Sequence, residues 1–325
     1  MKAIVLTEYG PPETLQLQEV AKPVPKDDEI LIKVHATSMN DWDWSIVQGT
    51  PFYMRLLCGL VKPKIRIPGV DVAGEVEAVG KDIQKFQPGD AVYGDLSESG
   101  FGSFAEYVCV PENAVVLKPA SMTFVEAAAI PHAAMLALQG LRDVGNLQPG
   151  QTLLINGAGG GVGTLGVQIA RALGVENITG VDHGRKLVMM RSIGFEQTID
   201  YMVEDFTKNG QLYDMILDPK TNRSPFDYAR VLTPNGLYAT VGGEMSRLLQ
   251  ALSLGPLIGL SSKKRIRIVA LKPNKDLAYI NELFEAGKIK PVIDGPYPFD
   301  ELPKALQYFG EGKHKGKVIL MMIND

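Results

Sequence analysis

The stretch LLINGAGGGVGTLGVQIARALG, residues 153–174, constrains the fold of this chain more than any other. It reads as an apolar strand, a glycine-crowded turn and a helix whose apolar residues recur at helical spacing. Ala158, Gly160 and Gly163 follow the spacing of a dinucleotide-binding turn, with alanine in place of the first glycine. The second glycine of that turn lets backbone approach a pyrophosphate, and the third lets the helix pack closely on the strand. The N-terminus of the helix then offers free N–H groups to the anion.

A second strand pattern, NITGVDH, follows this helix and strengthens the interpretation. It places Asp182 about 20 residues after Gly163, the spacing expected for an acidic residue that binds a ribose. A glycine-rich turn alone would be a weak signal, because such turns also connect strands to helices without binding anything. The predicted core of the cofactor site comprises Asn156, Gly157, Ala158, Gly159, Gly160, Gly161, Val162 and Gly163.

The strand patterns YDMILD, GLYATVGG and RIRIVAL continue the alternation of strands and helices toward the C-terminus. This alternation implies right-handed crossovers and a parallel sheet. Residues 126–272 are therefore predicted to form a doubly wound Rossmann domain. Gly242 and Gly243, at the end of the second pattern, are predicted to belong to the same cofactor site.

The first 120 residues carry β signals instead, including KAIVLTEYG, EILIKVHATSMN and GVDVAGEVEAVG, separated by Pro, Gly and Asp turns. They predict a closed or strongly bent β domain. The tail, with the helix pattern ELPKALQYFGEG and the strand pattern KGKVILMMI, is similar in character and is expected to return to that domain. The predicted β-rich domain thus comprises residues 1–125 and 273–325, which gives an α/β protein of two domains.

Two further segments have local patterns of their own. Thr123 with Glu126 three residues later has capping-box spacing and predicts a helix that is interrupted at Pro131. Residues 40–69 are aromatic, apolar and basic without clean periodicity, and are interpreted as a pocket wall. The side chains that could line this wall, or equally well pack in an ordinary core, are Trp42, Trp44, Phe52, Tyr53 and Met54.

Composition excludes several classes of function. Thirty-three basic and 37 acidic residues leave a net charge of −4, which argues against a nucleic-acid-binding protein. Cys58 and Cys109 are the only cysteines and stand in unlike contexts, so no disulfide framework and no thiolate zinc site is expected. A reducing cytoplasm fits this usage best. The chain opens on a strand pattern, so no signal peptide is expected. No transmembrane segment is expected either, because its longest apolar run is too short to span a bilayer.

The ordered motifs resemble those of the medium-chain dehydrogenase/reductase superfamily, in its zinc-free quinone oxidoreductase branch. The resemblance covers almost the whole chain. It rests on Asn40 and Asp43 after the second strand, GVDVAGEVEAVG with FQPGD, FAEYV, LALQGL, NGAGGGVG, IDY and the closing GKVIL. It implies a GroES-like catalytic domain, a Rossmann domain and a substrate cleft between them. It also implies hydride transfer from a reduced nicotinamide to a quinone or an α,β-unsaturated carbonyl compound.

The resemblance also bears on zinc. Zinc-dependent relatives carry a catalytic Cys where this chain has Asn40, His-Glu where it has Val70 and Asp71, and a Cys near His132. Their four-cysteine structural loop has no counterpart here. One histidine among Asn and Val cannot make a tetrahedral zinc site, so no metal is predicted.

Three residues are the catalytic candidates. Asn40, at the family's active-site position, can donate a hydrogen bond to a substrate carbonyl without titrating, although an Asn that caps a turn is the plainer interpretation. Asp43 is expected to hold that turn or a ribose. His132 could protonate an enolate, although a histidine on an apolar helix is more often a core residue. Relatives often have a Tyr where this chain has Ser45, so a Tyr general acid is not expected.

The signals for the cofactor oppose one another. Asp182 favours NAD(H), because its carboxylate would accept from the ribose and repel a 2′-phosphate. Arg185 and Lys186, with Tyr201 of the IDY motif, favour NADP(H), since related enzymes that use NADPH place such residues around that phosphate. We expect NADP(H), with NAD(H) as the alternative.

Two other functions stay open: a non-catalytic, crystallin-like NADPH-binding protein, and an alcohol dehydrogenase. The apolar run LLQALSLGPLIGL, residues 248–260, is expected to cover the mouth of the cleft or to be buried in a homodimer, and we favour the dimer.

Overall fold

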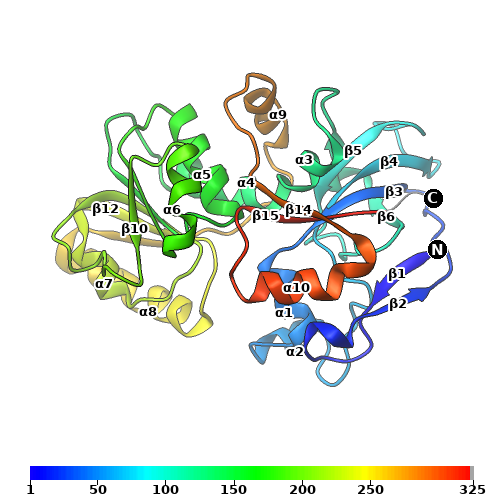
Figure 1. The fold of residues 1–325 in the computed structure, drawn as a ribbon, viewed down its shortest axis with the longest axis horizontal. Helices are drawn as coiled ribbons and strands as arrows, with labels where there is room; N and C mark the ends of the chain where they lie inside the picture. The colour runs from blue at the N-terminus through cyan, green and yellow to red at the C-terminus, as the bar shows by residue number, and fades with distance from the viewer. Residues whose placement is uncertain (323–325) are drawn as a thin grey trace. The chain divides into compact units, whose positions relative to one another are not determined.

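The computed structural model describes residues 1–322 and divides the chain into two compact units (Figure 1). The first unit consists of Met1–His132, Pro273–Glu285 and the residues from Ile293 onward. The second consists of Ala133–Lys272 and Ala286–Val292. The last three residues of the predicted β-rich domain, 323–325, and the end of its predicted last strand lie outside the described residues.

The first division falls inside helix α4 (Pro131–Leu138), later than the expected boundary at residue 125. The reason is packing, because the preceding helix α3 (Phe124–Ala128) lies against strands of the first unit. Thr123 caps α3 by accepting from the backbone N–H of Glu126, and α4 begins at Pro131, so the predicted capping box and interruption are both present. A π-helical turn (Gln139–Val144) continues α4.

A seven-stranded sheet forms the core of the first unit. Its order is β14 (Ile293–Pro298), β15 (Lys317–Met321), β3 (Glu29–Ser38), β4 (Asp71–Val79), β5 (Ala91–Asp95) and β7 (Val116–Leu117), with β6 (Tyr107–Pro111) also paired to β3. All pairs are antiparallel except β14 with β15. Because β15 comes from the tail and pairs with β3, the prediction that the tail returns to the β-rich opening is confirmed.

Strand register brings distant polar residues into one row across this sheet. Ser38 lies opposite Asp71, and Asp71 lies opposite Asp95. Ile319 of β15 lies opposite Ser38, so Lys317, two residues earlier, lies on the same face of the sheet. The row is thus set by pairing across four strands and not by any local motif.

The predicted pocket-wall segment folds into two short helices, α1 (Asp41–Gln48) and α2 (Tyr53–Cys58). Sequence periodicity missed them because six to eight residues span too few turns to show a stripe. Met54 is buried and Trp44 and Tyr53 pack against the core, whereas Phe52 is 65% exposed. The five candidates for the wall therefore divide between core and surface.

The remaining elements of the first unit frame its sheet. They are the two-stranded sheet β1 (Lys2–Val5) with β2 (Gln16–Glu19), the helices α9 (Leu277–Glu285) and α10 (Leu302–Gly310), and three 3-10 turns, Pro12–Thr14, Glu112–Ala114 and Phe299–Glu301. Figure 1 shows α10 beside the red strand β15, against which it packs.

The second unit contains a six-stranded, entirely parallel sheet. Its order is β10 (Gln197–Asp200), β9 (Ile178–Asp182), β8 (Leu153–Asn156), β11 (Tyr213–Asp218), β12 (Leu232–Thr240) and β13 (Arg265–Ile268). The chain winds outward from β8 in one direction and then from β11 in the other, which is the Rossmann order. The predicted parallel, doubly wound sheet is confirmed.

Helices cover both faces of this sheet. Right-handed crossovers put α5 (Gly161–Ala172) and α6 (Leu187–Ser192) on the face opposite α7 (Pro225–Arg230) and α8 (Met245–Ser262), as Figure 1 shows. A short turn (Gly184–Lys186) precedes α6. The apolar run of residues 248–260 lies within α8, which packs against β13 and α7 while its leucines Leu249, Leu252, Leu257 and Leu260 stay exposed.

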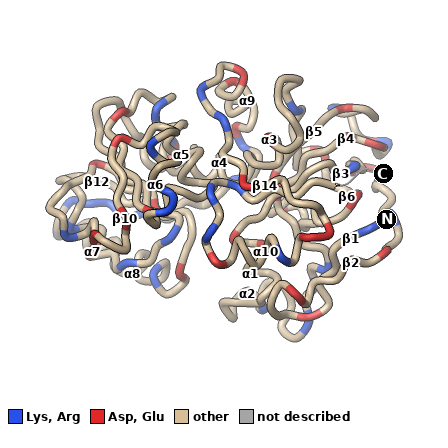
Figure 2. Tube along the Cα trace, in the orientation of Figure 1, with Lys and Arg blue, Asp and Glu red and all other residues tan. Residues whose placement is uncertain are grey.

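Charges are mixed over each unit. Figure 2 shows basic and acidic positions interspersed along the chain rather than gathered into one basic stripe. Among residues 1–322, no helix is both long enough and apolar enough to cross a membrane.

Candidate cofactor and active site

The glycine turn, defined here as residues 156–163, connects the carboxyl end of β8 to the N-terminus of α5. Gly157 has a φ of +94°, a conformation that favours glycine. The backbone N–H groups of Gly157 and Ala158 both donate to Val181 O of the neighbouring strand, at 2.9 and 3.0 Å. Gly160 is the N-cap of α5, so the free N–H groups of the first helical turn follow it directly.

Gly163 shows why this turn requires glycine. A Cβ at this position would lie 2.5 Å from both Cα and O of Ala158, and backbone atoms cannot move aside as a side-chain tip can. The absence of a side chain therefore lets α5 pack on the turn, as the sequence pattern predicted. Close packing and free helical N–H groups at the end of β8 fit the pyrophosphate of a dinucleotide.

Asp182 ends β9 and is engaged with the glycine turn. Its Oδ2 accepts from the N–H of Gly159 at 2.8 Å, and its Oδ1 accepts from the N–H of His183 at 2.8 Å. Lys186 places its Nζ 3.4 Å from Oδ1, and both side chains are buried. Burial lowers the pKa of Lys186 although the Asp182 carboxylate raises it. The acid and the base that pointed to different cofactors thus form one ion pair.

The other predicted cofactor residues lie around this pair. Arg185 is exposed on the turn before α6. Tyr201 follows β10, is 47% exposed and meets the ring of His183 edge-on, with 5.9 Å between ring centroids. The structure therefore brings these side chains to the carboxyl ends of β9 and β10, beside the glycine turn.

A buried carboxylate lies at the point where the strand order reverses between β8 and β11. Asp218 Oδ1 accepts from Asn156 Nδ2 at 2.9 Å, and its Oδ2 accepts from the hydroxyl of Tyr238 at 2.9 Å. Burial raises the pKa of Asp218. Sequence reasoning missed Asp218 and Tyr238, although an acid at the end of a buried strand pattern was visible in YDMILD.

Gly242 and Gly243 follow β12 and join this network. Gly242 O accepts from the hydroxyls of Thr240 and Thr221, the former at 2.9 Å. Gly243 has a φ of +110°, and a Cβ there would lie 2.2 Å from Lys220 O. Both glycines therefore shape the carboxyl edge of the sheet, where doubly wound proteins bind their ligands.

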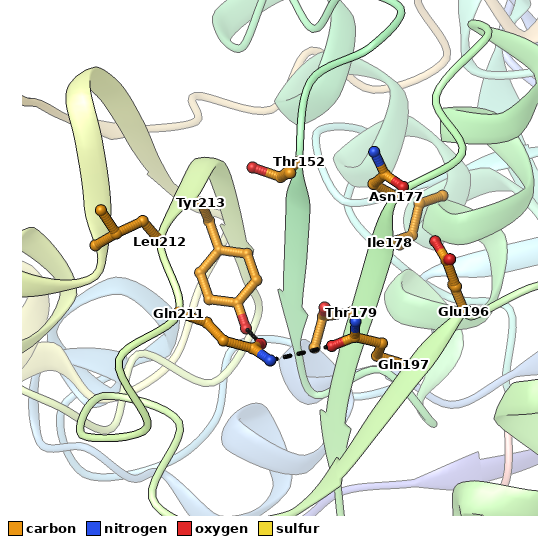
Figure 3. A pocket seen from close by; sticks show the side chains of 9 residues that line it. All are labelled: Thr152, Asn177, Ile178, Thr179, Glu196, Gln197, Gln211, Leu212 and Tyr213. Carbon is orange, nitrogen blue, oxygen red and sulfur yellow. Dashed lines mark hydrogen bonds between the residues drawn. The ribbon is translucent and has the colours of Figure 1, made fainter.

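A cavity of about 260 Å³ opens at the opposite, amino edge of the same sheet (Figure 3). Tyr213 is one of its lining residues, and its hydroxyl donates to Gln211 at 2.7 Å (Figure 3). Thr152, Ile178 and Gln197 come from the starts of neighbouring strands. Because its lining comes from strand starts, this cavity is separate from the glycine turn.

The first unit contains a buried polar cluster, defined here as Ser38, Asn40, Asp71, Asp95, His132 and Lys317. Asp71 is its centre and is fully buried. Its Oδ2 accepts from Ser38 Oγ at 2.5 Å, Asn40 Nδ2 at 2.9 Å and Lys317 Nζ at 2.9 Å. Its Oδ1 accepts from the backbone N–H of His132 at 2.9 Å. Four donors thus compensate a carboxylate that burial alone would destabilise.

Asn40 is both the N-cap of α1 and a member of this cluster. Its backbone N–H donates to Asp43 Oδ2 at 2.9 Å. Asn40 is 5% exposed. Its side-chain oxygen Oδ1 accepts from Lys317 Nζ at 2.7 Å, and its side-chain nitrogen Nδ2 donates to Asp71. The backbone of Asn40 therefore takes part in the cap of α1, whereas the catalytic interpretation concerns its side chain.

Asp43 is fully buried and holds the turn before α1. Its two carboxylate oxygens accept from the backbone N–H groups of Asn40 and Gly69, at 2.9 and 3.1 Å. Of the two expected roles, this geometry matches the turn, because both oxygens are already occupied. Burial raises the pKa of Asp43 to about 7 against the backbone hydrogen bond and the nearby Lys317 that lower it.

His132 lies in the first turn of α4 and forms a buried pair with Asp95. Its Nδ1 lies 2.8 Å from Asp95 Oδ2, and Asp95 Oδ1 accepts from the N–H of Ser97 at 2.8 Å. Burial lowers the pKa of His132, but the charge and hydrogen bond of Asp95 outweigh it, so the pKa is raised overall. The carboxylate holds one ring nitrogen and leaves Nε2 as the nitrogen that can exchange a proton with another group.

Sequence reasoning missed four of the six members of the cluster as functional candidates: Ser38, Asp71, Asp95 and Lys317. Two local signals were present: the motif GVDVAGEVEAVG contains Asp71, and the motif GKVIL contains Lys317. Among residues 1–322, no three His, Cys, Asp or Glu side chains come together in a way that could hold a metal ion.

Comparisons with known proteins agree with this architecture. The model of the alcohol dehydrogenase GroES-like domain matches residues 26–120, and that of the zinc-binding dehydrogenase family matches residues 193–320. A 2-methylene-furan-3-one reductase of Solanum lycopersicum is 33% identical over 98% of this chain and 79% of its own length. The chain belongs to the medium-chain dehydrogenase/reductase superfamily.

Other members of the superfamily match along their full length. The chloroplast envelope quinone oxidoreductase homologue of Arabidopsis thaliana is 30% identical over 98% of both chains. The structure of the quinone oxidoreductase from Coxiella burnetii superposes with a TM-score of 0.85 at 26% identity and covers 99% of both chains. The resemblance to this superfamily and to its quinone oxidoreductases is thereby confirmed, as is the GroES-like and Rossmann architecture.

Proposed function

We propose that this protein reduces a quinone or an α,β-unsaturated carbonyl compound with NAD(P)H and without zinc. The buried polar cluster carries the proposal, because it supplies an amide donor and a histidine paired with a carboxylate in place of metal ligands. The names of the relatives, among them an NADPH-dependent alkenal/one oxidoreductase of Arabidopsis thaliana, support the same reaction.

When bound at the glycine turn, the reduced nicotinamide supplies a hydride with its electron pair. In an enone, hydride addition to the β-carbon moves the electrons of the alkene to the carbonyl oxygen and forms an enolate. Asn40 Nδ2 donates to that oxygen as its charge grows, which is the role of an oxyanion-hole donor. His132, whose pKa the paired Asp95 carboxylate raises, donates one proton to the α-carbon, so the product is the saturated carbonyl compound.

NADP(H) is the proposed cofactor. Lys186 offsets the charge of Asp182 at 3.4 Å, which reduces the repulsion that this carboxylate would exert on a 2′-phosphate. Arg185 is exposed beside the same turn and can approach the phosphate directly. The name of the alkenal/one oxidoreductase, which is NADPH-dependent, agrees with this choice.

We also propose a cytoplasmic homodimer. The exposed leucines of α8 support the dimer, because an apolar face of this kind is commonly covered by a partner in solution. Sedimentation at micromolar concentration should give twice the monomer mass of 35.3 kDa, and a monomer would contradict the proposal.

An acceptor panel tests the reaction. Purified protein is mixed with NADPH or NADH and a benzoquinone, a naphthoquinone, an alkenal or an alkenone, or with NADP⁺ or NAD⁺ and a saturated alcohol, and absorbance at the band of the reduced nicotinamide is followed. We expect turnover with quinones or enones and none with the alcohol. Tight NADPH binding without oxidation by any acceptor would favour a non-catalytic protein, and oxidation of the alcohol that depends on added zinc would favour an alcohol dehydrogenase.

A further inference from the structure

Lys317 is the lysine of the buried polar cluster, and the reaction just described leaves it without a role. It opens β15, and its side chain is 4% exposed. Its ammonium donates to Asn40 Oδ1 at 2.7 Å, Asp71 Oδ2 at 2.9 Å and Met39 O at 3.2 Å. Three acceptors therefore match its three N–H bonds.

These contacts settle which way the Asn40 carboxamide points. A lysine ammonium has no acceptor, so the Asn40 atom that faces it must be the oxygen Oδ1. On the other side, Asp71 Oδ2 receives the amide nitrogen Nδ2 at 2.9 Å. Reversing the carboxamide would set its NH₂ against the ammonium and its oxygen against the carboxylate. Lys317 and Asp71 together thus exclude the flipped orientation.

In this orientation one N–H of Asn40 Nδ2 is bonded to Asp71 and the other has no acceptor among the described residues of the protein. A carboxamide that could flip would present its oxygen to a substrate for part of the time. An oxygen repels a carbonyl oxygen that is gaining negative charge, whereas an N–H stabilises it. The value of Asn40 to catalysis depends on which end it presents.

We propose that Lys317 is a positioning residue that fixes Asn40 as a hydrogen-bond donor toward the substrate carbonyl. It acts through Asn40 and does not itself touch the substrate. This inference rests on the proposed function, because it specifies how the amide donor of that reaction is held in place.

The first test replaces Lys317 by Met, which keeps the length of the side chain and removes its charge and donors. For an enone we expect kcat to fall about 100-fold, the size typical of losing one oxyanion donor. Lys317→Arg keeps a cation and should restore part of the rate. Lys313→Met removes an exposed lysine, paired with Glu311, from the segment before β15 and should leave kcat unchanged.

A double-mutant cycle separates positioning from a general structural role. If Lys317 acts through Asn40, then Lys317→Met should cost almost nothing further once Asn40→Ala is present. If it serves only to balance the charge of Asp71, then Asp71→Asn combined with Lys317→Met should recover the wild-type rate. That recovery, or fully multiplicative losses in the Asn40 cycle, would overturn the proposal.

Two readouts guard against misfolding and against failure of the parent hypothesis. NADPH affinity, measured by fluorescence, should be unchanged in Lys317→Met because the glycine turn belongs to the other unit. The loss in kcat should be greater for an enone than for an electron-poor quinone, whose oxygen needs less help to accept charge. A wild-type protein inactive with every acceptor refutes the reaction itself, whereas an active wild type with an equally active Lys317→Met refutes only the role of Lys317.

Discussion

The glycine turn and the polar cluster are assembled from the sequence in opposite ways. The turn and its acidic partner lie within residues 156–186 and interact with their near neighbours along the chain. The cluster draws Ser38, Asp95 and Lys317 from strands that are far apart in sequence. One site is therefore defined by spacing and the other by strand register, and they should respond differently to substitution.

Gly163→Ala should have the largest effect, and it should be confined to the glycine turn. The added Cβ would meet backbone atoms of Ala158 at 2.5 Å, so the turn must distort and cofactor affinity should fall by at least about 1,000-fold, roughly 4 kcal/mol. Gly166→Ala on the same helix is the matched control, since its Cβ meets only side-chain atoms, the nearest at 3.3 Å. Titration of NADPH into both variants measures the difference. Equal affinities would show that the turn does not hold the cofactor.

Asp43→Asn should change how the free energy of unfolding depends on pH, and it should leave the structure of the glycine turn unchanged. Because the folded pKa is raised to about 7 from 3.8, the folded state holds a proton that the unfolded state releases. Wild-type stability should therefore decline by roughly 4 kcal/mol from this group as pH rises from about 4 to 7. Asp43→Asn should lose that slope. Urea melts at several pH values measure it, with Asp41→Asn, exposed on the same helix, as the control. An unchanged slope in Asp43→Asn would mean that the carboxyl titrates normally.

The ion pair beside the glycine turn makes a third prediction. Arg185→Met should weaken the binding of NADPH by about 1.5–3 kcal/mol and leave the binding of NADH unchanged, because only NADPH has the 2′-phosphate to which Arg185 would donate a hydrogen bond. Lys186→Met should weaken both cofactors, since it leaves the buried Asp182 without its cation. Asp182→Ser should weaken NADH most, and Arg191→Met on exposed α6 should change neither affinity. If the wild-type protein binds NADH tenfold more tightly than NADPH, and if replacing both Arg185 and Lys186 changes neither affinity, then the cofactor is NAD(H) and not NADP(H).

Asp95→Asn should have the smallest effect, a shift in the pH profile. The Asp95 carboxylate raises the pKa of His132, so an active site that needs the imidazolium should lose activity as pH rises through that raised pKa. Removing the carboxylate should move the descending limb of kcat to lower pH. Asp82→Asn, at an exposed site, is the control. If the descending limb of the kcat profile lies at the same pH in Asp95→Asn as in the wild type, His132 is not the proton donor.

The contrast between the sites explains what the sequence could predict. Parallel strands, crossovers and the glycine turn follow from patterns within 20 to 30 neighbouring residues, and all three are present. Asp71 lies in the motif GVDVAGEVEAVG, but its place beside Asp95 could not be predicted, because only the pairing of β4 with β5 sets the two opposite each other. The pairing of Lys186 with Asp182 depended on side-chain packing over Gly159, which a count of charges cannot show. Helices α1 and α2 were missed because they are too short for periodicity.

The central claim is that an amide donor in the polar cluster replaces a metal in polarising the substrate. It is tested most directly by measuring NADPH oxidation with one enone before and after exhaustive chelation, for wild type and Asn40→Ala together, with the zinc content of each sample. We predict that the wild-type rate survives chelation, that zinc is substoichiometric, and that Asn40→Ala lowers kcat about 100-fold at unchanged NADPH affinity. One zinc per chain, with activity lost on chelation and restored by zinc, would contradict the claim.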